Sequence, residues 1–217
     1  MKLSKNTMNY LKHFSTISPN FVFQKGTQQN TISFGKDRAV STTLDTSFPL
    51  DFPIKDLGGF VKAASSLNDP DVFFSKSKLT LLDKNGKILF KRSKKRELIV
   101  LTKKINFPDP EVEFEISNKK YMSLVNSLKR HGFYYITFKG DGKFITAESE
   151  LSYKGEYIYI QRLGSTQKQF SFRFRATNLI CPVDDYLVSI STKGIGRFQS
   201  KNSDYISYIA IDKPKST

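Results

Sequence analysis

Residues 4–17, with the sequence SKNTMNYLKHFSTI, decide the fold, because they predict an amphipathic helix that has a counterpart later in the chain. Ser4 is a suitable N-cap, since its hydroxyl can accept a hydrogen bond from an otherwise unpaired backbone N–H. Five residues at helical spacing predict a buried stripe, namely Thr7, Tyr10, Leu11, Phe14 and Ile17. A helix over residues 4–17 is therefore the first expected element.

A second helix is predicted over residues 118–131, with Ser117 or Asn118 as its cap and Gly132 as its left-handed terminator. Its expected buried stripe lies 114 residues after the first and consists of Tyr121, Leu124, Val125 and Leu128. At the same offset Lys25-Gly26 corresponds to Lys139-Gly140, which predicts a turn in an aromatic-rich hairpin after each helix. This repetition predicts a duplicated domain.

Each half is also expected to contain another helix after a short aromatic strand. In the first half this helix covers residues 55–68, and its inner stripe is Leu57, Phe60, Val61 and Ala64. In the second half phenylalanines alternate with polar residues over 170–175, and a shorter helix over 176–181 ends before Pro182. Further strands are expected at 72–75, 79–83, 88–91, 97–101, 157–161, 186–191, 197–200 and 205–211, with tight turns at Asn85-Gly86 and Asp141-Gly142.

The two halves are joined by an extended connector over residues 102–110, which contains two prolines and no periodic pattern. The expected boundary lies near Pro108, giving an N-terminal domain of residues 1–107 and a C-terminal domain of residues 108–217. The sequence therefore predicts an α+β protein with two similar domains, each with two helices packed on antiparallel sheet.

The composition is that of a folded protein, because 38% of the 217 residues are hydrophobic and 13% are aromatic. The lone Cys181 excludes a disulfide framework and a cysteine-based metal cluster. No apolar run approaches the ~20 residues of a membrane span, and the N-terminus lacks the apolar region of a signal peptide. A soluble, reduced, intracellular protein is expected.

The formal net charge is +15, an excess that usually indicates a polyanionic partner such as nucleic acid. The alternative is compositional drift, because 27 of the 35 basic residues are lysine, as an AT-rich genome would favour. The position of the charge is therefore more informative than its amount.

The basic residues are concentrated on the predicted outer faces of three helices. These faces carry Lys5, Asn9, Lys12, Thr16; Lys55, Gly59, Lys62, Ser66; and Lys119, Ser123, Asn126, Arg130. Asp56 is the one acid in these helices, whereas an ordinary solvated face would mix both signs. Small polar groups and lysines without carboxylates are what a surface facing DNA phosphates requires, and such contacts do not read sequence.

No catalytic constellation is recognisable. A phosphate-binding glycine loop is absent, and residues 193–196 are interpreted as a turn. His13 and His131 have no ligand or acid/base partner at suitable spacing, so they are expected to be exposed or to face a partner. The acidic strand 111–115 and Asp184-Asp185 do not complete a metal or acid/base site. The basic run 91–96 is interpreted as a hairpin tip, so no enzyme, cofactor or metal is expected.

Several segments resemble the sliding clamps of T-even-type bacteriophages, the processivity factors of DNA polymerases. They are residues 1–7 and 11–17, residues 56–60 and 67–69, the connector residues 105–108, and residues 185–187, 193–194, 197–198 and 205–210. The match is thin at each position but spans nearly the whole chain in the right order.

The resemblance implies that three subunits close head to tail into a ring lined by twelve helices, with sheet edges paired between subunits. The implied DNA-facing residues are Lys5, Asn9, Lys12, Lys55, Lys62, Lys119, Lys120, Asn126 and Arg130. The implied peptide pocket for partners consists of Val40, Leu44, Ile105, Phe107, Ile211 and Pro214. Clamps of this family are usually acidic outside the hole, whereas here the first half carries about +11 and the second about +4.

The resemblance also implies partners and a location. Duplex DNA, a DNA polymerase, an ATP-driven clamp loader and, in some relatives, late-transcription factors are expected, in the cytoplasm of an infected bacterium. Two other functions remain open at this stage. The aromatic and basic residues of 170–175 would suit a single-strand-binding protein with exposed rings, and a virion protein would leave the helix charge unexplained.

Overall fold

The chain divides into two compact units, Met1–Lys104 and Ile105–Thr217, in a computed structural model that describes residues 1–150 and 158–212. The division falls three residues before the boundary expected at residues 107 and 108. No helix in the described residues is long and apolar enough to cross a membrane.

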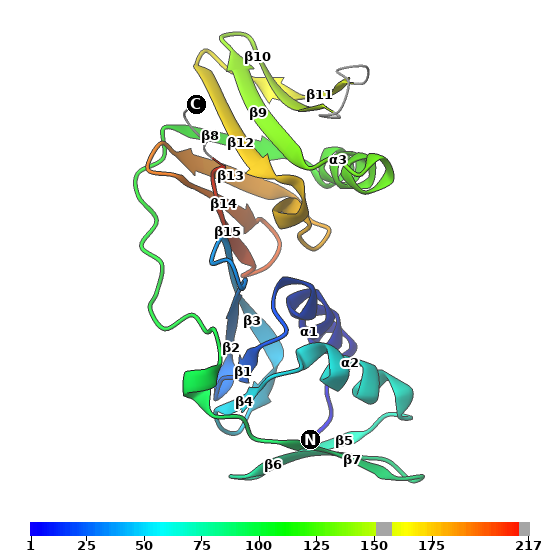
Figure 1. Ribbon diagram of the computed structural model, residues 1–217. Helices are drawn as coiled ribbons and strands as arrows, with labels where there is room; N and C mark the ends of the chain where they lie inside the picture. The colour runs from blue at the N-terminus through cyan, green and yellow to red at the C-terminus, as the bar shows by residue number, and fades with distance from the viewer. Residues whose placement is uncertain (151–157, 213–217) are drawn as a thin grey trace. The chain divides into compact units, whose positions relative to one another are not determined.

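The first unit contains two α-helices, seven strands and a short 3₁₀ helix (Figure 1). In order they are α1 (Lys5–Ile17), β1 (Phe21–Phe23), β2 (Gly26–Ile32), β3 (Arg38–Phe48), β4 (Phe52–Ile54), α2 (Leu57–Ser66), β5 (Asp71–Phe74), β6 (Lys78–Leu82), β7 (Lys87–Lys91) and η1 (Lys95–Glu97). All pairings are antiparallel: β1 with β4, β2 with β3, and β6 between β5 and β7.

The second unit begins with a strand and then follows the same pattern. Its elements are β8 (Val112–Ile116), α3 (Asn118–His131), β9 (Tyr135–Asp141), β10 (Phe144–Glu150), β11 (Ile158–Ser165), β12 (Gln169–Arg175), η2 (Ala176–Leu179), β13 (Tyr186–Ser191), β14 (Ile195–Ser200) and β15 (Ile206–Ala210). One antiparallel sheet has the order β11-β10-β9-β12, and β8, β13, β14 and β15 are antiparallel neighbours in a second.

The two units repeat one element order: a helix, four strands, a second helical segment and three strands. Even the strand before the helix has an equivalent, because the backbones of Met1 and Val72 exchange hydrogen bonds of 2.7 and 3.0 Å. The chain start therefore lies beside β5 as β8 lies beside β13. The duplicated α+β arrangement expected from the sequence is confirmed.

The second helical segments of the two units are not equivalent, contrary to the prediction. Residues 176–179 form only a 3₁₀ helix, η2, and the chain leaves it at Ile180. Pro182 stops the segment before a second turn, and so short a helix gains too few hydrogen bonds to offset its nucleation. The described residues thus contain three α-helices, one fewer than the subunit expected to supply four to the ring.

Three further expectations are corrected by the structure. Helix α2 begins at Leu57 rather than Lys55, because Asp56 is the N-cap and accepts from the Gly59 N–H at 2.7 Å. Lys139-Gly140 lies inside β9, and the turn is at Gly142, whose φ is +89°. Residues 98–101 form no strand, since no neighbouring strand is paired with them.

The basic run 91–96 is not a hairpin tip. The tip between β6 and β7 is at residues 83–86, where Asp83 accepts from the Asn85 and Gly86 N–H groups at 2.8 and 2.9 Å. Lys91 ends β7, and residues 92–94 lead into η1. The chain reverses direction at an Asn-Gly turn that is closed by an aspartate, so the lysines after β7 are not part of the turn.

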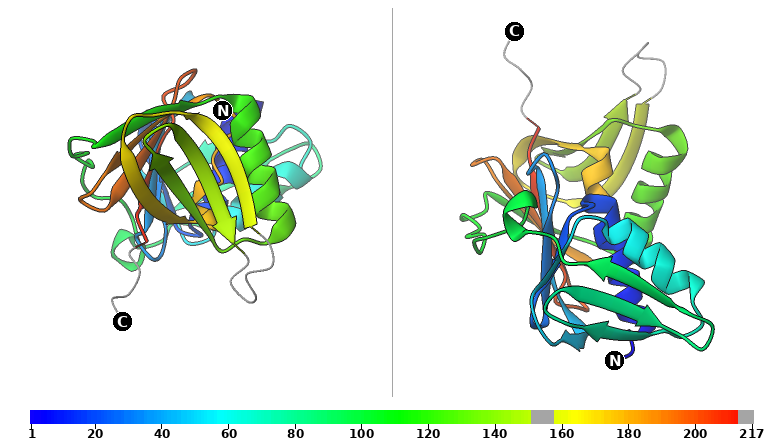
Figure 2. Two further views of the ribbon diagram at one scale, coloured as in Figure 1. Left: turned by 90° about the horizontal axis from the view of Figure 1, so that it is seen from above. Right: turned by 60° about the horizontal axis from the view of Figure 1, so that its bottom comes forward.

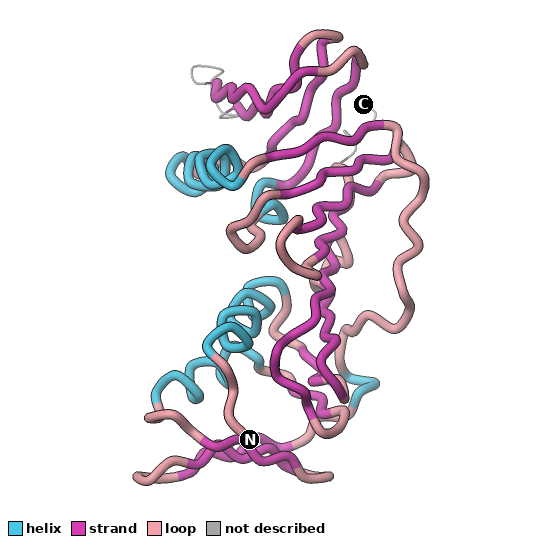
Figure 3. The backbone as a smooth tube through the Cα atoms, turned by 180° about the vertical axis from the view of Figure 1, so that it is seen from behind, coloured by secondary structure: helices cyan, strands magenta, loops and turns pink. Residues whose placement is uncertain are grey.

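Each unit has an aromatic core between its helices and sheets. In the first unit the Phe23 ring lies 5.0–5.5 Å from the rings of Phe48, Phe60 and Phe74. In the second, Phe138 and Phe174 are 5.8 Å apart and both contact Phe198 at 6.1 Å. Burial of each ring contributes about 1.5–3 kcal/mol. Figure 3 shows that within each unit the helices lie to one side of the strands.

Candidate nucleic-acid interface

Helix α1 turns a polar face to solvent because its other face is fixed to β3. Its buried residues are Thr7, Leu11 and Phe14. The Ser4 hydroxyl accepts from the Thr7 N–H at 2.9 Å and donates to Asp45 at 2.6 Å, and the Thr7 hydroxyl also donates to Asp45. These bonds lower the pKa of Asp45. With that rotation set, Lys5, Asn9 and Lys12 are exposed on the opposite face.

Helix α2 packs beside α1, as the right-hand view of Figure 2 shows, and its outer face is also polar. Its buried side consists of Leu57, Phe60, Val61 and Ala64, which leaves Lys62 exposed. Lys55 does not belong to this face. It precedes the helix, and its ammonium lies 2.6 Å from the Glu97 carboxylate of η1.

Helix α3 in the second unit has the same construction. Tyr121, Leu124, Val125 and Leu128 are buried. The opposite face carries exposed residues at i, i+4, i+7 and i+11, namely Lys119, Ser123, Asn126 and Arg130. Ser117 is the N-cap residue but makes no side-chain cap bond. Asp185, at the start of the β13 region, accepts from the Asn118 N–H at 2.6 Å instead.

Lys120 points along a flank of α3 rather than outward. Its ammonium donates to the Leu163 carbonyl at 2.5 Å, and its own carbonyl accepts from the Gln161 side chain at 3.0 Å. Lys120 therefore fastens α3 to β11 and is not on the polar face. Of the nine residues expected to face DNA, the structure brings Lys5, Asn9, Lys12 and Lys62 together on the adjacent helices α1 and α2, and Lys119, Asn126 and Arg130 on α3.

The three α-helices contain no acidic residue at all. They comprise 13, 10 and 14 residues, among which the chain's average composition would place about three acids. The first turns are where the helix dipole would favour a carboxylate, and they hold none. The outer helix faces thus carry unneutralised positive charge spaced by small polar side chains, a surface suited to phosphates and without base-reading geometry.

The residues expected to form a peptide pocket come from both units of the chain. Val40 and Leu44 are buried in the first unit. In the second unit Phe107 packs 6.2 Å from Tyr208, under the Arg197 guanidinium at 4.7 Å. Ile211 lines a separate pocket of about 450 Å³, together with Phe172, Arg173 and Asp212 among others. Pro214 lies outside the described residues.

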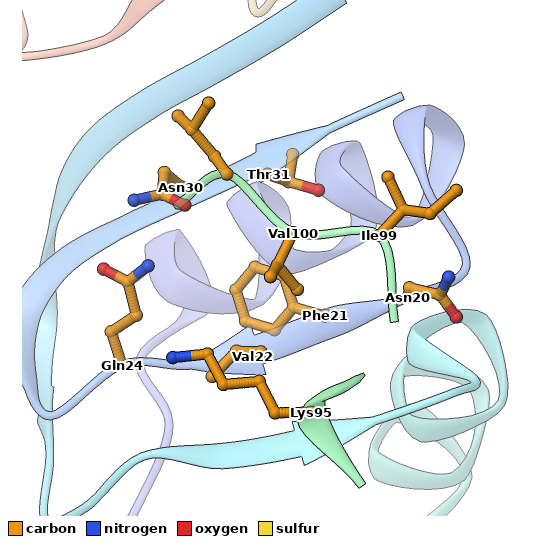
Figure 4. Close-up of a pocket in the computed structure, with 10 residues that line it drawn as sticks. Asn20, Phe21, Val22, Gln24, Asn30, Thr31, Lys95, Ile99 and Val100 are labelled. Carbon is orange, nitrogen blue, oxygen red and sulfur yellow. The ribbon is translucent and has the colours of Figure 1, made fainter. Parts of the chain in front are cut away.

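A small cavity in the first unit is closed by the chain that leads to the connector. Ile99 and Val100 cross the strand residues Phe21 and Val22, as Figure 4 shows, and Leu101 also lines the cavity. The enclosed volume is about 20 Å³, which is enough for one water molecule and not for a ligand.

The acidic residues in and just before β8 form hydrogen bonds and salt bridges that hold neighbouring segments. Glu111 accepts from the Thr192 N–H at 2.7 Å and from its hydroxyl at 2.5 Å, which lowers the pKa of Glu111 to about 2. Glu115 forms a 2.7 Å salt bridge with Lys201, as expected for carboxylates beside a basic neighbour. No group of three metal-ligating side chains occurs in the described residues.

His13 is half-buried, contrary to the expectation of an exposed or partner-facing ring. Its Nε2 atom lies 3.4 Å from the guanidinium of the buried Arg38. Burial, and then the charge of Arg38, lower the pKa of His13 to about 3. The ring is therefore neutral at physiological pH and belongs to the packing of α1. His131 is also half-buried, 5.6 Å from the Phe133 ring.

The phenylalanines of β12 do not form an exposed stacking surface. Phe174 is fully buried, and Phe170 packs 5.9 Å from Phe172 and 6.4 Å from Phe114. Base stacking needs accessible ring faces. The single-strand-binding alternative therefore lacks the exposed rings that it predicted at residues 170–175.

No protein-family model matches the sequence. The sliding clamp of Vibrio phage KVP40 is 24% identical to this chain over 214 residues, which cover 94% of this chain and 97% of that protein. Proliferating Cellular Nuclear Antigen from Entamoeba histolytica superimposes with a TM-score of 0.69 at 12% identity, covering 96% of this chain and 95% of that one. A chain in the complex of the FEN-1 C-terminal region with A. fulgidus PCNA gives a TM-score of 0.69 at 9% identity and 96% coverage of both. The two-unit fold is the fold of these clamp structures.

Proposed function

We propose that this chain is one subunit of a phage-type DNA sliding clamp, a non-enzymatic ring that encircles duplex DNA and tethers the replicative polymerase. The observation that carries the proposal is the acid-free, lysine-bearing outer face on helices of both units. Two units with one element order can present such faces repeatedly around a channel. The likeness to a phage clamp over nearly the whole chain supports the same function.

The ring holds DNA by topology rather than by tight binding. Lys5, Lys12 and Lys62 from the first unit, and Lys119 and Arg130 from the second, make screened and exchangeable contacts with phosphates. Since these contacts read no base, they have similar energy at every position along the duplex. The ring therefore slides while it stays linked to the template.

The ring closes head to tail through two sheet edges, β7 and β11. Two of the other edges are covered: Met1 lies beside β5, and the Asp212 N–H donates to the Arg173 carbonyl of β12 at 2.7 Å. In the described residues no strand adjoins the outer edge of β7 or of β11. An uncovered edge invites pairing with another chain, and two different edges on one subunit suit a heterologous, closing interface.

The side chains on these two edges are complementary. Leu89 on β7 is 51% exposed, and Ile158 and Ile160 on β11 are 57% and 61% exposed. Lys87 and Lys91 flank Leu89 on the same face of β7. The register partners of Ile158 and Ile160 on β10 are Glu150 and Glu148. At the seam, an apolar centre would be flanked by lysines from β7 and by glutamates beside β11. This arrangement would favour one register of β7 on β11 over shifted registers in a ring of three subunits.

Partner proteins would dock a short apolar peptide at the pocket that Ile211 lines. Ile105 and Phe107 of the connector would provide further contacts. The replicative polymerase is the principal partner. An ATP-driven loader opens the ring, and late-transcription factors use the loaded ring as a platform. These partners place the protein in the cytoplasm of an infected bacterium.

Solution mass and DNA retention test the proposal. We expect three times the chain mass of 24.8 kDa, rapid loss from linear duplex, and retention on circular or end-blocked duplex after loading. Ile160→Asp should break the seam and abolish both the trimer and the retention. Val183→Asp is the matched control, since Val183 is 57% exposed and belongs to neither edge strand. Equal retention on linear and circular DNA would contradict encirclement.

A further inference from the structure

The β6–β7 region holds most of the chain's excess charge. Residues 76–96 contain one acid, Asp83, and nine basic residues: Lys76, Lys78, Lys84, Lys87, Lys91, Arg92, Lys94, Lys95 and Arg96. That local excess of eight is more than half of the net charge of +15. All nine basic residues are exposed. The run 91–96 is thus the end of a larger basic region, which covers β6, β7, their flanking turns and η1 and does not belong to α1, α2 or α3.

Strand geometry places several of these lysines on one face of the sheet. Lys78 and Lys91 are directly paired across β6 and β7, so their side chains point to the same side. Arg92 follows at once, with its N–H on the Ser77 carbonyl at 3.0 Å and its guanidinium at 3.4 Å from the Lys76 carbonyl. Like charges directly opposite each other destabilise a sheet. A bound anion would remove that cost.

The neighbouring carboxylates do not neutralise this surface. No salt bridge joins any of the nine basic residues to a carboxylate within the part of the chain that the structure describes. Asp83 is occupied by backbone N–H groups of its turn, and Glu97 is paired with Lys55. These contacts lower the pKa of both acids. The positive field of the surface therefore extends into solvent.

Apolar side chains are exposed on the same face. Phe73, Leu82 and Leu89 are 50%, 41% and 51% exposed, and Thr80 lies between Phe73 and Leu89 in the register. Lys78 and Lys91 form the next pair on this face. The other face of the sheet, with Leu79 and Leu81, is buried in the core. The result is an accessible aromatic ring beside a row of cations.

We propose that this face, defined by Phe73, Lys78 and Lys91 with Lys76 at its end, is a second nucleic-acid contact and binds a single strand. The cations track the phosphates, and the Phe73 ring stacks on a base. An acidic protein segment would also complement the positive charge, but its binding would not require the exposed aromatic ring of Phe73. The site is distinct from the helix faces. It adjoins the proposed seam at Lys91 of β7, whereas Phe73 and Lys78 belong to β5 and β6, so a loaded ring could hold a strand that is not within its channel.

Binding of a short oligothymidine, measured by fluorescence anisotropy over a range of salt, tests the charged part of the site. The variant carries Lys76→Gln, Lys78→Gln and Lys91→Gln. The matched control carries Lys25→Gln, Lys36→Gln and Lys103→Gln, with the same change in net charge in the same unit. Each lost contact should reduce the slope of log affinity against log salt by about 0.7 in the variant. Equal slopes in variant and control would overturn the proposal.

Phe73→Ala tests the choice of a single strand. Loss of one stacked base should weaken oligothymidine binding about fivefold or more, while binding of a duplex of equal length stays unchanged. Equal weakening of oligothymidine and duplex binding by Phe73→Ala would overturn the choice of a single strand. Full competition by polyglutamate, equally strong in wild type and in Phe73→Ala, would also overturn it. In the Ile160→Asp background single-strand binding should persist. That result separates this site from the proposed ring, because failure of ring closure alone leaves it intact.

Discussion

Acidification is expected to destabilise the first unit through His13 before its carboxylates begin to titrate. The folded pKa of His13 is about 3, against 6.5 when the chain is unfolded. Below pH 6.5 the unfolded state binds a proton that the folded state does not, so stability is full above 6.5 and falls as the pH falls towards 3. The loss is about 1.4 kcal/mol for each pH unit, and so about 2 kcal/mol at a pH near 5.

The cause of this loss is local. A proton on the ring would sit next to the Arg38 guanidinium, which is 3.4 Å from Nε2 and itself buried. The acids whose pKa is lowered in the first unit, Asp45, Asp83 and Glu97, lose their stabilising interactions only as the pH falls through lower values. The window between pH 6.5 and 5 therefore reports mainly on His13.

Urea unfolding followed by circular dichroism at several pH values measures the effect. His13→Gln keeps a polar acceptor for Arg38 but cannot titrate, so its unfolding midpoint should stay nearly constant over this window. His131→Gln serves as the control and should retain the wild-type dependence. If wild type and His13→Gln lose stability in parallel between pH 6.5 and 5, the account of His13 is refuted.

Two further substitutions test how each unit holds its elements in place, with urea midpoints as the measurement. Gly140→Ala should cost about 1–3 kcal/mol, because its Cβ would lie 2.4 Å from the Phe170 ring and 2.7 Å from the Lys168 carbonyl. Gly86→Ala, whose Cβ would meet nothing within 4 Å, should be nearly neutral; similar costs would contradict the steric reasoning. Asp185→Ala should cost about 1 kcal/mol by uncapping α3, and an unchanged midpoint would show that water replaces this cap.

Much of the fold could be predicted from the sequence because its signals are local. The stripes of α1 and α3 follow helical spacing, and their buried residues Leu11, Phe14, Leu124 and Leu128 are the ones expected. Strand β13 has the predicted bounds, β5 and β6 begin and end one residue earlier than predicted, and β7 begins one residue earlier. The acid-free helix faces are also a property of sequence, since the period of a helix fixes which residues share a face.

Expectations failed where distant residues decide the outcome. Residues 97–101 have the composition of a strand, but a strand needs a partner, and none adjoins them in the described residues. The cross-strand lysine pair Lys78 and Lys91 was missed, although the alternation on both sides of the Asn85-Gly86 turn could have revealed it. The register across the hairpin must be known before two lysines can be placed opposite each other, and the composition of the run 91–96 does not give that register.

The sequence by itself determined which residues could line a positively charged surface, and that this surface occurs on helices of both halves. Only the tertiary structure decided which of them do so. Lys55 and Lys120 are lysines like Lys5 and Lys119, yet they are bound to Glu97 and to the Leu163 carbonyl. The reason is physical: periodicity orients a side chain relative to its own helix, whereas the packing of other elements supplies or withholds the groups that capture its charge.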